Sequence, residues 1–118
     1  MSFEKHGQLR ERARKFALRI INMSQALPNT RAANVISNQI LRAATGMAAN
    51  YRAAGRSRSR AEFIAKVGVA LEEADETLFW LKLLADSRIV KPKKLHDLLA
   101  EINELIAIFA ASRRTAKE

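Results

Sequence analysis

The sequence predicts an all-α protein, an antiparallel up-down four-helix bundle. Three observations lead to this fold. The 118 residues include only 4 Gly and 2 Pro, and 48% are hydrophobic, many of them the good helix formers Ala and Leu. In four stretches the apolar residues recur every three or four positions. Short polar breaks separate these stretches, and helices joined by short linkers pack antiparallel.

The first two helices are expected at about residues 7–27 and 30–54. Thr30 is a suitable N-cap for the second helix, and Gly55 is a typical stop signal. The second helix is rich in small residues, which either let a neighbouring backbone approach closely or only reflect high helix propensity. These small residues are Ala43, Ala44, Gly46, Ala48, Ala49, Ala53 and Ala54.

The third and fourth helices are expected at about residues 59–86 and 92–112. The third opens with Ser59 and, three residues later, Glu62, which is the pattern of a capping box. The fourth opens at Pro92, a residue suited to the first helical position. The polar residues after 112 are expected to fray.

Length and composition exclude several classes of protein. The chain is the size of one domain, and we expect a single bundle over residues 1–118. No apolar run approaches the roughly 20 residues that cross a bilayer. The first residues are charged where a secretory signal would be apolar, and the chain has no Cys. These features favour a soluble, cytoplasmic protein.

Positive charge is concentrated in the first half of the chain. Residues 1–60 contain 12 Lys and Arg against 2 Glu, a net charge of +10. Residues 61–118 contain 9 Lys and Arg against 10 Asp and Glu, a net charge of −1. A segregated positive half suggests a polyanionic partner such as nucleic acid, although solubility alone also explains it.

Two arginine clusters carry this charge, one around the break after residue 54 and one on the first helix. Arginine suits phosphate because its planar guanidinium donates two hydrogen bonds at once. Only Tyr51 interleaves the first cluster, which argues for backbone contacts and against base readout. Alternatively, the arginines pair with acids of the third helix. The predicted nucleic-acid-binding residues are Arg52, Arg56, Arg58, Arg60, Arg10, Arg12 and Arg14.

A second apolar face is expected on the third helix. At about 100° per residue, its core stripe is centred on Val67 and Ala74. Exposed aromatic residues commonly mark an interface, so we predict a homo-oligomer contact here, although a wide core stripe or a covering loop would also explain the pattern. The residues that point away from the stripe are Val69, Phe79, Trp80 and Leu83.

No metal or cofactor site is predicted. A di-iron bundle needs Glu-x-x-His pairs, but the only histidines are His6 and His96, and Lys93 stands where a partner Glu of His96 would be. The acidic run at residues 72–76 spreads around its helix, which favours a solvated face or partners for arginines.

No enzymatic activity is predicted either. There is no Cys, and no Ser lies in a Gly-rich elbow. Asn50 and Tyr51 are polar residues on the core-facing side of the second helix, where hydrogen bonds that fix packing are the commoner role. An enzyme that uses Asn50, Tyr51 and Glu73 is the weaker alternative.

Residues 42–84, RAATGMAANYRAAGRSRSRAEFIAKVGVALEEADETLFWLKLL, resemble a bacterial four-helix-bundle family. That family includes proteins encoded in intervening sequences of 23S rRNA genes and the accessory variability determinant of diversity-generating retroelements. The shared pattern consists of Ala49-Asn50, Gly55-Arg56, Ser59 with Glu62-Phe63, Glu73, Glu76 and Trp80-Leu81.

The resemblance implies a ring-forming homo-oligomer, typically a homopentamer. From the residues themselves we predict structural polar roles for Asn50, Tyr51, Glu73 and Glu76. In the retroelement branch the resemblance also implies a basic surface that contacts nucleic acid and a reverse transcriptase. The family more commonly has Asn-Ile-Ala-Glu-Gly before the turn, so Ala54 replaces a Glu whose role does not transfer. We therefore predict a non-enzymatic, ring-forming nucleic-acid-binding protein, accessory to a reverse transcriptase or to an rRNA-associated element. The alternative is a protein-interaction scaffold that binds no nucleic acid.

Overall fold

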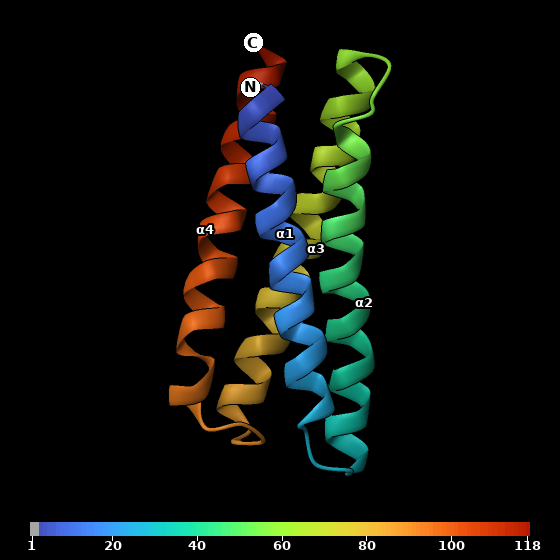
Figure 1. Ribbon diagram of the computed structural model, residues 1–118. Coiled ribbons are helices and arrows are strands. Elements are labelled where there is room, and N and C mark those ends of the chain that lie inside the picture. The colour runs from blue at the N-terminus through green and yellow to red at the C-terminus, as the bar shows by residue number, and fades with distance from the viewer. Residues whose placement is uncertain (1–2) are drawn as a thin grey trace.

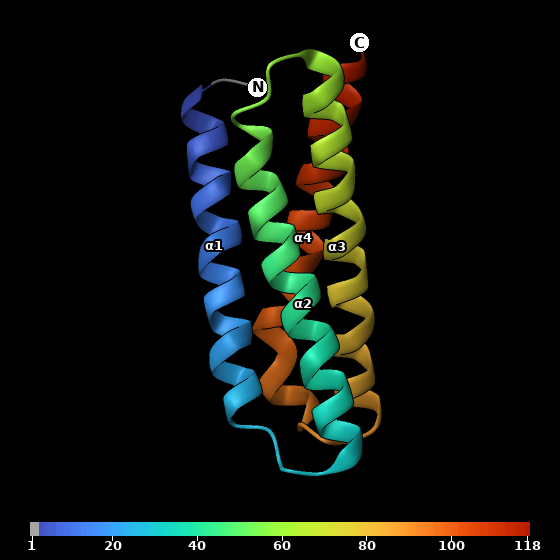
Figure 2. The same cartoon turned by 90° about the vertical axis from the view of Figure 1, so that its right-hand side faces the viewer.

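A computed structural model describes residues 3–118 as four helices in sequence. They are α1 (Phe3–Gln25), α2 (Arg31–Ala54), α3 (Arg60–Asp86) and α4 (Pro92–Lys117). The helices run alternately in opposite directions and form a rod of 44 × 21 × 19 Å (Figure 1). Each helix packs against the next along the chain, and α4 closes the bundle against α1 (Figure 2). The predicted antiparallel four-helix bundle is confirmed.

The predicted helix starts are also confirmed at α2, α3 and α4. The Thr30 Oγ1 atom accepts a hydrogen bond of 3.2 Å from the Ala33 N–H, and the Ser59 Oγ atom accepts one of 3.0 Å from the Glu62 N–H. Each satisfies a backbone donor that the first helical turn leaves free. Pro92 lies in the first turn of α4, where its missing N–H costs nothing.

The two outer helices are longer than predicted. Helix α1 begins at Phe3, four residues before the expected start, and α4 continues to Lys117, so the expectation of a frayed tail after residue 112 is wrong. Ser112 is buried, and the Arg60 Nε atom donates a hydrogen bond to the Ala116 carbonyl oxygen. These tertiary contacts hold the last turns of α4, and the alanines among them favour helix.

The core consists of one apolar stripe from each helix, as predicted. Its largest fully buried side chains include Phe16, Tyr51 and Phe109. Helix α3 buries a wider arc than predicted, because Thr77 and Leu84 are also fully buried. Thr77 satisfies its hydroxyl within the helix, where Oγ1 donates to the Glu73 carbonyl oxygen at 2.8 Å.

The seam between α1 and α4 is the most open side of the bundle. Near both chain ends it holds a hollow of about 500 Å³ with an apolar floor that includes Leu9, Phe63 and Ile108. Figures 1 and 2 show that the start of α1, the end of α2, the start of α3 and the end of α4 meet at one end of the rod, here named the terminal end. The opposite end, named the distal end, carries the α1–α2 and α3–α4 connections.

Candidate functional site: a basic surface at the terminal end

The predicted arginine turn lies on the terminal end, between α2 and α3. Arg52, Arg56 and Arg58 are all exposed there. Arg58 has Glu62 near it, with 3.9 Å between Nε and Oε2, whereas no ion pair joins Arg52 or Arg56 to a carboxylate within residues 3–118. Two strongly basic side chains of the turn therefore face solvent without a neutralising partner among the described residues.

Helix α1 brings Arg10 and Arg14 beside Arg52. The three side chains surround a hollow of about 260 Å³ that is also lined by Glu11 of α1 and by Ala48 and Ala49 of α2. Arg14 donates two hydrogen bonds to Glu11, at 3.0 Å from Nε and 2.8 Å from Nη2, and these contacts raise its pKa. Arg10 forms no ion pair within the described part of the chain. The small residues leave room between the two helices, and the arginines flank it.

Arg12 and Arg60, predicted as members of the same group, point elsewhere. The Arg12 Nη2 atom lies 2.6 Å from Glu101 and 3.3 Å from Glu104 of α4, on the α1–α4 side of the bundle. The hydrogen bond to Glu101 is the main cause that raises the pKa of Arg12. Arg60 is engaged with the Ala116 carbonyl oxygen. The expected pairing with acids is thus real for Arg12, but the acids belong to α4 and not to α3.

The end of α4 adds cations that the sequence reasoning missed. Arg114 and Lys117 are exposed in its last turn, and Arg113 lies over Gly68 of α3. A Cβ atom at position 68 would lie 3.1 Å from the Arg113 Nε atom, so the glycine gives the guanidinium its space. These residues escaped attention because the tail was expected to fray. The available signal was their position within one or two turns after the helix formers Ala110 and Ala111, from which the helix continues.

An aromatic stack lies beneath the basic surface. Tyr51 is fully buried, with its ring centroid 4.5 Å from that of His6 and 4.8 Å from that of Phe109. Burial raises the pKa of Tyr51 to about 12. His6 is half-buried, and a Cβ atom at Gly55 would lie 2.3 Å from its Nε2 atom. Gly55 follows the end of α2 with a φ of −66°, so it is not the left-handed cap for which glycine is usually chosen. Its missing side chain instead leaves space for His6.

The polar residues of the weaker enzyme alternative do not converge. The Asn50 Nδ2 atom donates to the Gly46 carbonyl oxygen of its own helix at 2.8 Å, while Tyr51 points into the core. Glu73 instead contacts Arg42 of α2, with 3.3 Å between Oε2 and Nη1. Within residues 3–118 no group of three or more His, Cys, Asp or Glu residues is placed to hold a metal ion.

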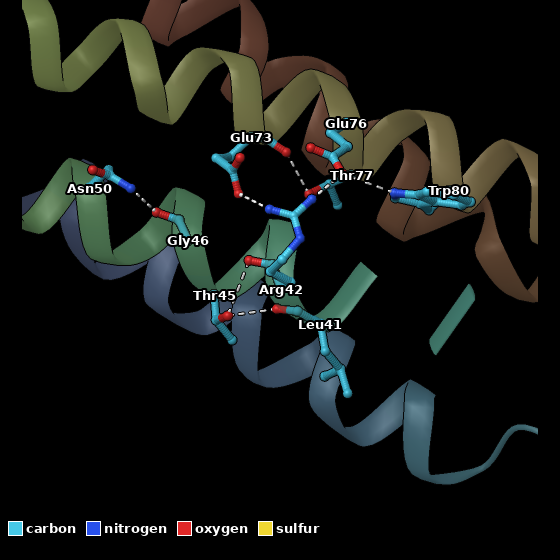
Figure 3. Close-up of polar contacts among 9 residues, drawn as sticks. All are labelled: Leu41, Arg42, Thr45, Gly46, Asn50, Glu73, Glu76, Thr77 and Trp80. Atoms are coloured by element: carbon cyan, nitrogen blue, oxygen red, sulfur yellow. Dashed lines mark hydrogen bonds and ion pairs between the residues drawn. The ribbon is translucent and has the colours of Figure 1, made fainter. Parts of the chain in front are cut away.

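Arg42 is the centre of a polar cluster between α2 and α3, and the sequence reasoning missed it (Figure 3). Its guanidinium pairs with Glu73 and Glu76, and Glu76 also accepts a hydrogen bond of 3.4 Å from Trp80 Nε1. The hydrogen bond from Arg42 is the main reason that the pKa of Glu76 is lowered. This cluster joins two neighbouring helices on the outside of the bundle, which is a structural role.

The predicted apolar face of α3 is narrower than expected. Val69 and Phe79 are 41% and 53% exposed, as a free face requires. Trp80 and Leu83 were expected in water, which is wrong, because both are half-buried and pack against the core. The wide buried arc of α3, which lies between α2 and α4, reaches these two positions. Phe79 contacts the edge of Trp80, with 4.9 Å between ring centroids.

No helix in residues 3–118 is long and apolar enough to cross a membrane. Comparison with curated proteins finds no match. Among solved structures, the chain is similar to a protein of unknown function from the S23 ribosomal protein family of Bacteroides thetaiotaomicron. The two share 33% identity over 93% of this chain and 98% of that one, with a TM-score of 0.86. The family model for the 23S rRNA-intervening sequence protein matches residues 5–111, and the chain belongs to that family.

Proposed function

We propose that the protein is a non-enzymatic, self-associating nucleic-acid-binding protein, and that its terminal end contacts the phosphate backbone. The observation that carries this proposal is that Arg10 and Arg52 line one hollow, that Arg56 is exposed in the turn that follows Arg52 at the same end, and that none of the three has an ion pair among the described residues. These arginines come from two helices and a turn, and Arg114 and Lys117 of α4 extend the same end. Like charges are gathered here at an electrostatic cost that a polyanion would offset.

The chemistry of this surface favours contacts to phosphate. A guanidinium donates paired hydrogen bonds to phosphate oxygens, and the hollow between Arg10 and Arg52 has no aromatic face on which a base could stack. Binding is therefore expected to follow shape and charge, with little dependence on base sequence. The family and its solved relative carry ribosomal names, so RNA is the first partner to test.

The scaffold alternative rests on the arginines that do have acidic partners. They are Arg12, Arg14 and Arg58 of the predicted surface, and Arg42, which pairs with Glu73 and Glu76 of α3. An exposed ion pair holds a side chain only weakly, so Arg14 and Arg58 can exchange their carboxylates for phosphate. Arg12 is less exposed and has two glutamates, and we exclude it from the proposed surface. The assembly part of the proposal is supported by the exposed Val69 and Phe79 on α3, and the ring and its homopentameric size remain proposals from the resemblance.

Replacing Arg10, Arg52 and Arg56 together with Ala tests the RNA surface. Binding of a fluorescein-labelled RNA hairpin, followed by anisotropy between about 50 and 200 mM salt, should weaken at every salt concentration. The slope of log K against log salt should become shallower by about 2–3, because each lost phosphate contact removes somewhat less than one released counterion. The three side chains are exposed, so the helical circular dichroism should not change.

A matched variant removes the same charge elsewhere. Arg31, Lys82 and Lys93 are exposed on other parts of the bundle, and their replacement with Ala should leave most of the RNA affinity intact. Equal loss in both triple variants would mean that only net charge matters. A wild-type protein that does not bind RNA or DNA hairpins at low salt would refute the proposal. Loss of the oligomer in the Arg10, Arg52 and Arg56 variant would instead favour the scaffold.

A further inference from the structure

The distal end holds a hollow of about 390 Å³, here named the distal hollow. It lies where the end of α1 meets the α3–α4 connection and the start of α4. Its floor is apolar and includes Leu27, Ile89 and Leu95. Three cations also line it, Arg88, Lys91 and Lys94, and no acid is among its described lining residues.

The charges of the distal hollow are not neutralised within the described part of the chain. No ion pair there joins Arg88, Lys91 or Lys94 to a carboxylate within residues 3–118. Lys91 and Lys94 lie at the beginning of α4, where the positive end of the helix dipole disfavours cations. An apolar floor with an unneutralised basic edge fits an occupant that is itself apolar in the middle and acidic at the edges.

The outward face of α3 has this complementary character. Glu72, Asp75, Phe79 and Asp86 are spaced three, four and seven residues apart, which places them on one side of a helix. All four are exposed, and none of the three acids forms an ion pair within residues 3–118. Lys82 is exposed on the same side, three residues after Phe79, so the net charge of this side is −2, from three acids and one lysine. Phe79 is therefore a large exposed apolar side chain in a stripe of negative net charge, here named the α3 stripe.

We propose that the α3 stripe of one copy docks into the distal hollow of a second copy, with Phe79 on the apolar floor and Asp75 and Asp86 against the lysines. This inference rests on the self-association in the proposed function and names its two contacting surfaces. Both surfaces lie near the distal end. Phe79 is seven residues, or about 10 Å along the helix, from the last residue of α3. Leu95 is three residues, or about 5 Å, from the first residue of α4. Two bundles side by side in the same direction can therefore bring them together with a small offset.

The two surfaces are different, so the contact is head-to-tail. The distal hollow belongs to the α1 and α4 side of the bundle, whereas the stripe is on the outside of α3, diagonally across from α1. After a single contact the pair thus keeps one free hollow on one copy and one free stripe on the other, and repetition of the contact closes a ring if the rotation permits. The RNA surface at the terminal end is left open.

A charge-swap experiment tests this contact. Variant A carries Lys91→Glu and Lys94→Glu in the hollow, and variant B carries Asp75→Lys and Asp86→Lys in the stripe. Light scattering coupled to size exclusion should show that each variant alone falls to one subunit, with a subunit dissociation constant at least about tenfold weaker than that of the wild type. A mixture of A and B should form mixed oligomers in which the two variants alternate, because the intact stripe of A fits the intact hollow of B and the reversed stripe of B fits the reversed hollow of A. All four changes in one chain should restore assembly.

The controls separate this inference from the rest of the proposed function. Arg31→Glu with Lys93→Glu changes charge at the same end outside the hollow and should leave the mass unchanged. Variant A should remain helical and should still bind the RNA hairpin through the terminal end. A wild-type mass of one subunit would overturn self-association itself. An oligomer that neither variant weakens, or a mixture of A and B that forms no mixed oligomers, would overturn this contact alone.

Discussion

At the scale of single residues, the contacts of His6 show best how much of the structure can be predicted from the sequence. Tyr51 was predicted on the core stripe of α2, and it is fully buried. His6 lies just outside the predicted first helix, which began at about Gly7, whereas α1 begins at Phe3. Only the packed bundle shows that the imidazole lies between Tyr51 and the backbone of Gly55. Such a contact between residues 45 or more positions apart leaves no periodic signal in a sequence.

His6 should make the stability of the bundle depend on pH. Desolvation by burial, and then the nearby charge of Arg10, lower its pKa below the ordinary 6.5. The unfolded chain therefore binds the proton more readily than the native one. The free energy of unfolding should be highest above about pH 6.5 and should fall as the pH drops through this value toward the lowered native pKa.

Urea titrations between about pH 5 and pH 8 measure this effect. The carboxyl groups of Glu11 and Glu76, whose pKa values are lowered, affect stability at more acidic pH, outside this range. The His6→Phe variant keeps an aromatic ring on Tyr51 without a titrating group, and its stability should change less over this range. His96→Phe, at an exposed position of α4, is the matched control and should behave as the wild type. Equal pH dependence in wild type and His6→Phe would show that His6 is not responsible.

At the scale of helices, the sequence predicted where each helix begins better than where it ends or which of its faces are buried. N-caps such as Thr30 and Ser59 are local contacts within one turn, so residue identity is enough to find them. The end of α4 depends on contacts from α3, such as that of Arg60, which are not local. The faces of α3 were misjudged for a related reason. A helix that lies between two neighbours buries a wider arc, and this arc includes Trp80 and Leu83.

The caps can be tested by comparison with the helix that lacks one. Thr30→Ala and Ser59→Ala should each lower the free energy of unfolding by about 1 kcal/mol, because a backbone N–H in the first turn loses its acceptor. Lys91, at the same position of α4, makes no capping hydrogen bond through its side chain. Lys91→Ala should therefore change stability by less than about 0.5 kcal/mol. Chemical denaturation of the three variants measures the difference, and similar losses in all three would contradict the role of the caps.

At the scale of the whole molecule, the spacing of the apolar residues was enough to predict the four-helix architecture. It was not enough to predict which residues share a surface. Four apolar stripes with short linkers allow few arrangements other than this bundle. Which cations share a surface depends on the rotation and register of the helices. The sequence could therefore name Arg10 and Arg52 as candidates, but it could not show that Arg12 lies on a different side of the bundle. The distal hollow combines residues near position 27 with residues near position 90, and no pattern in the sequence joins them.

The order of the helices also determines how the chain reaches this structure. Most tertiary contacts join helices that follow one another, and only the sparse α1–α4 seam joins the two ends of the sequence. Folding rates rise as contacts become more local, so a bundle of this kind should fold in microseconds to milliseconds. Temperature-jump relaxation should resolve this phase, and a dominant folding time of seconds would contradict it. Folding would then be complete before two chains meet, and subunit association should appear as a separate, slower step whose rate rises with protein concentration.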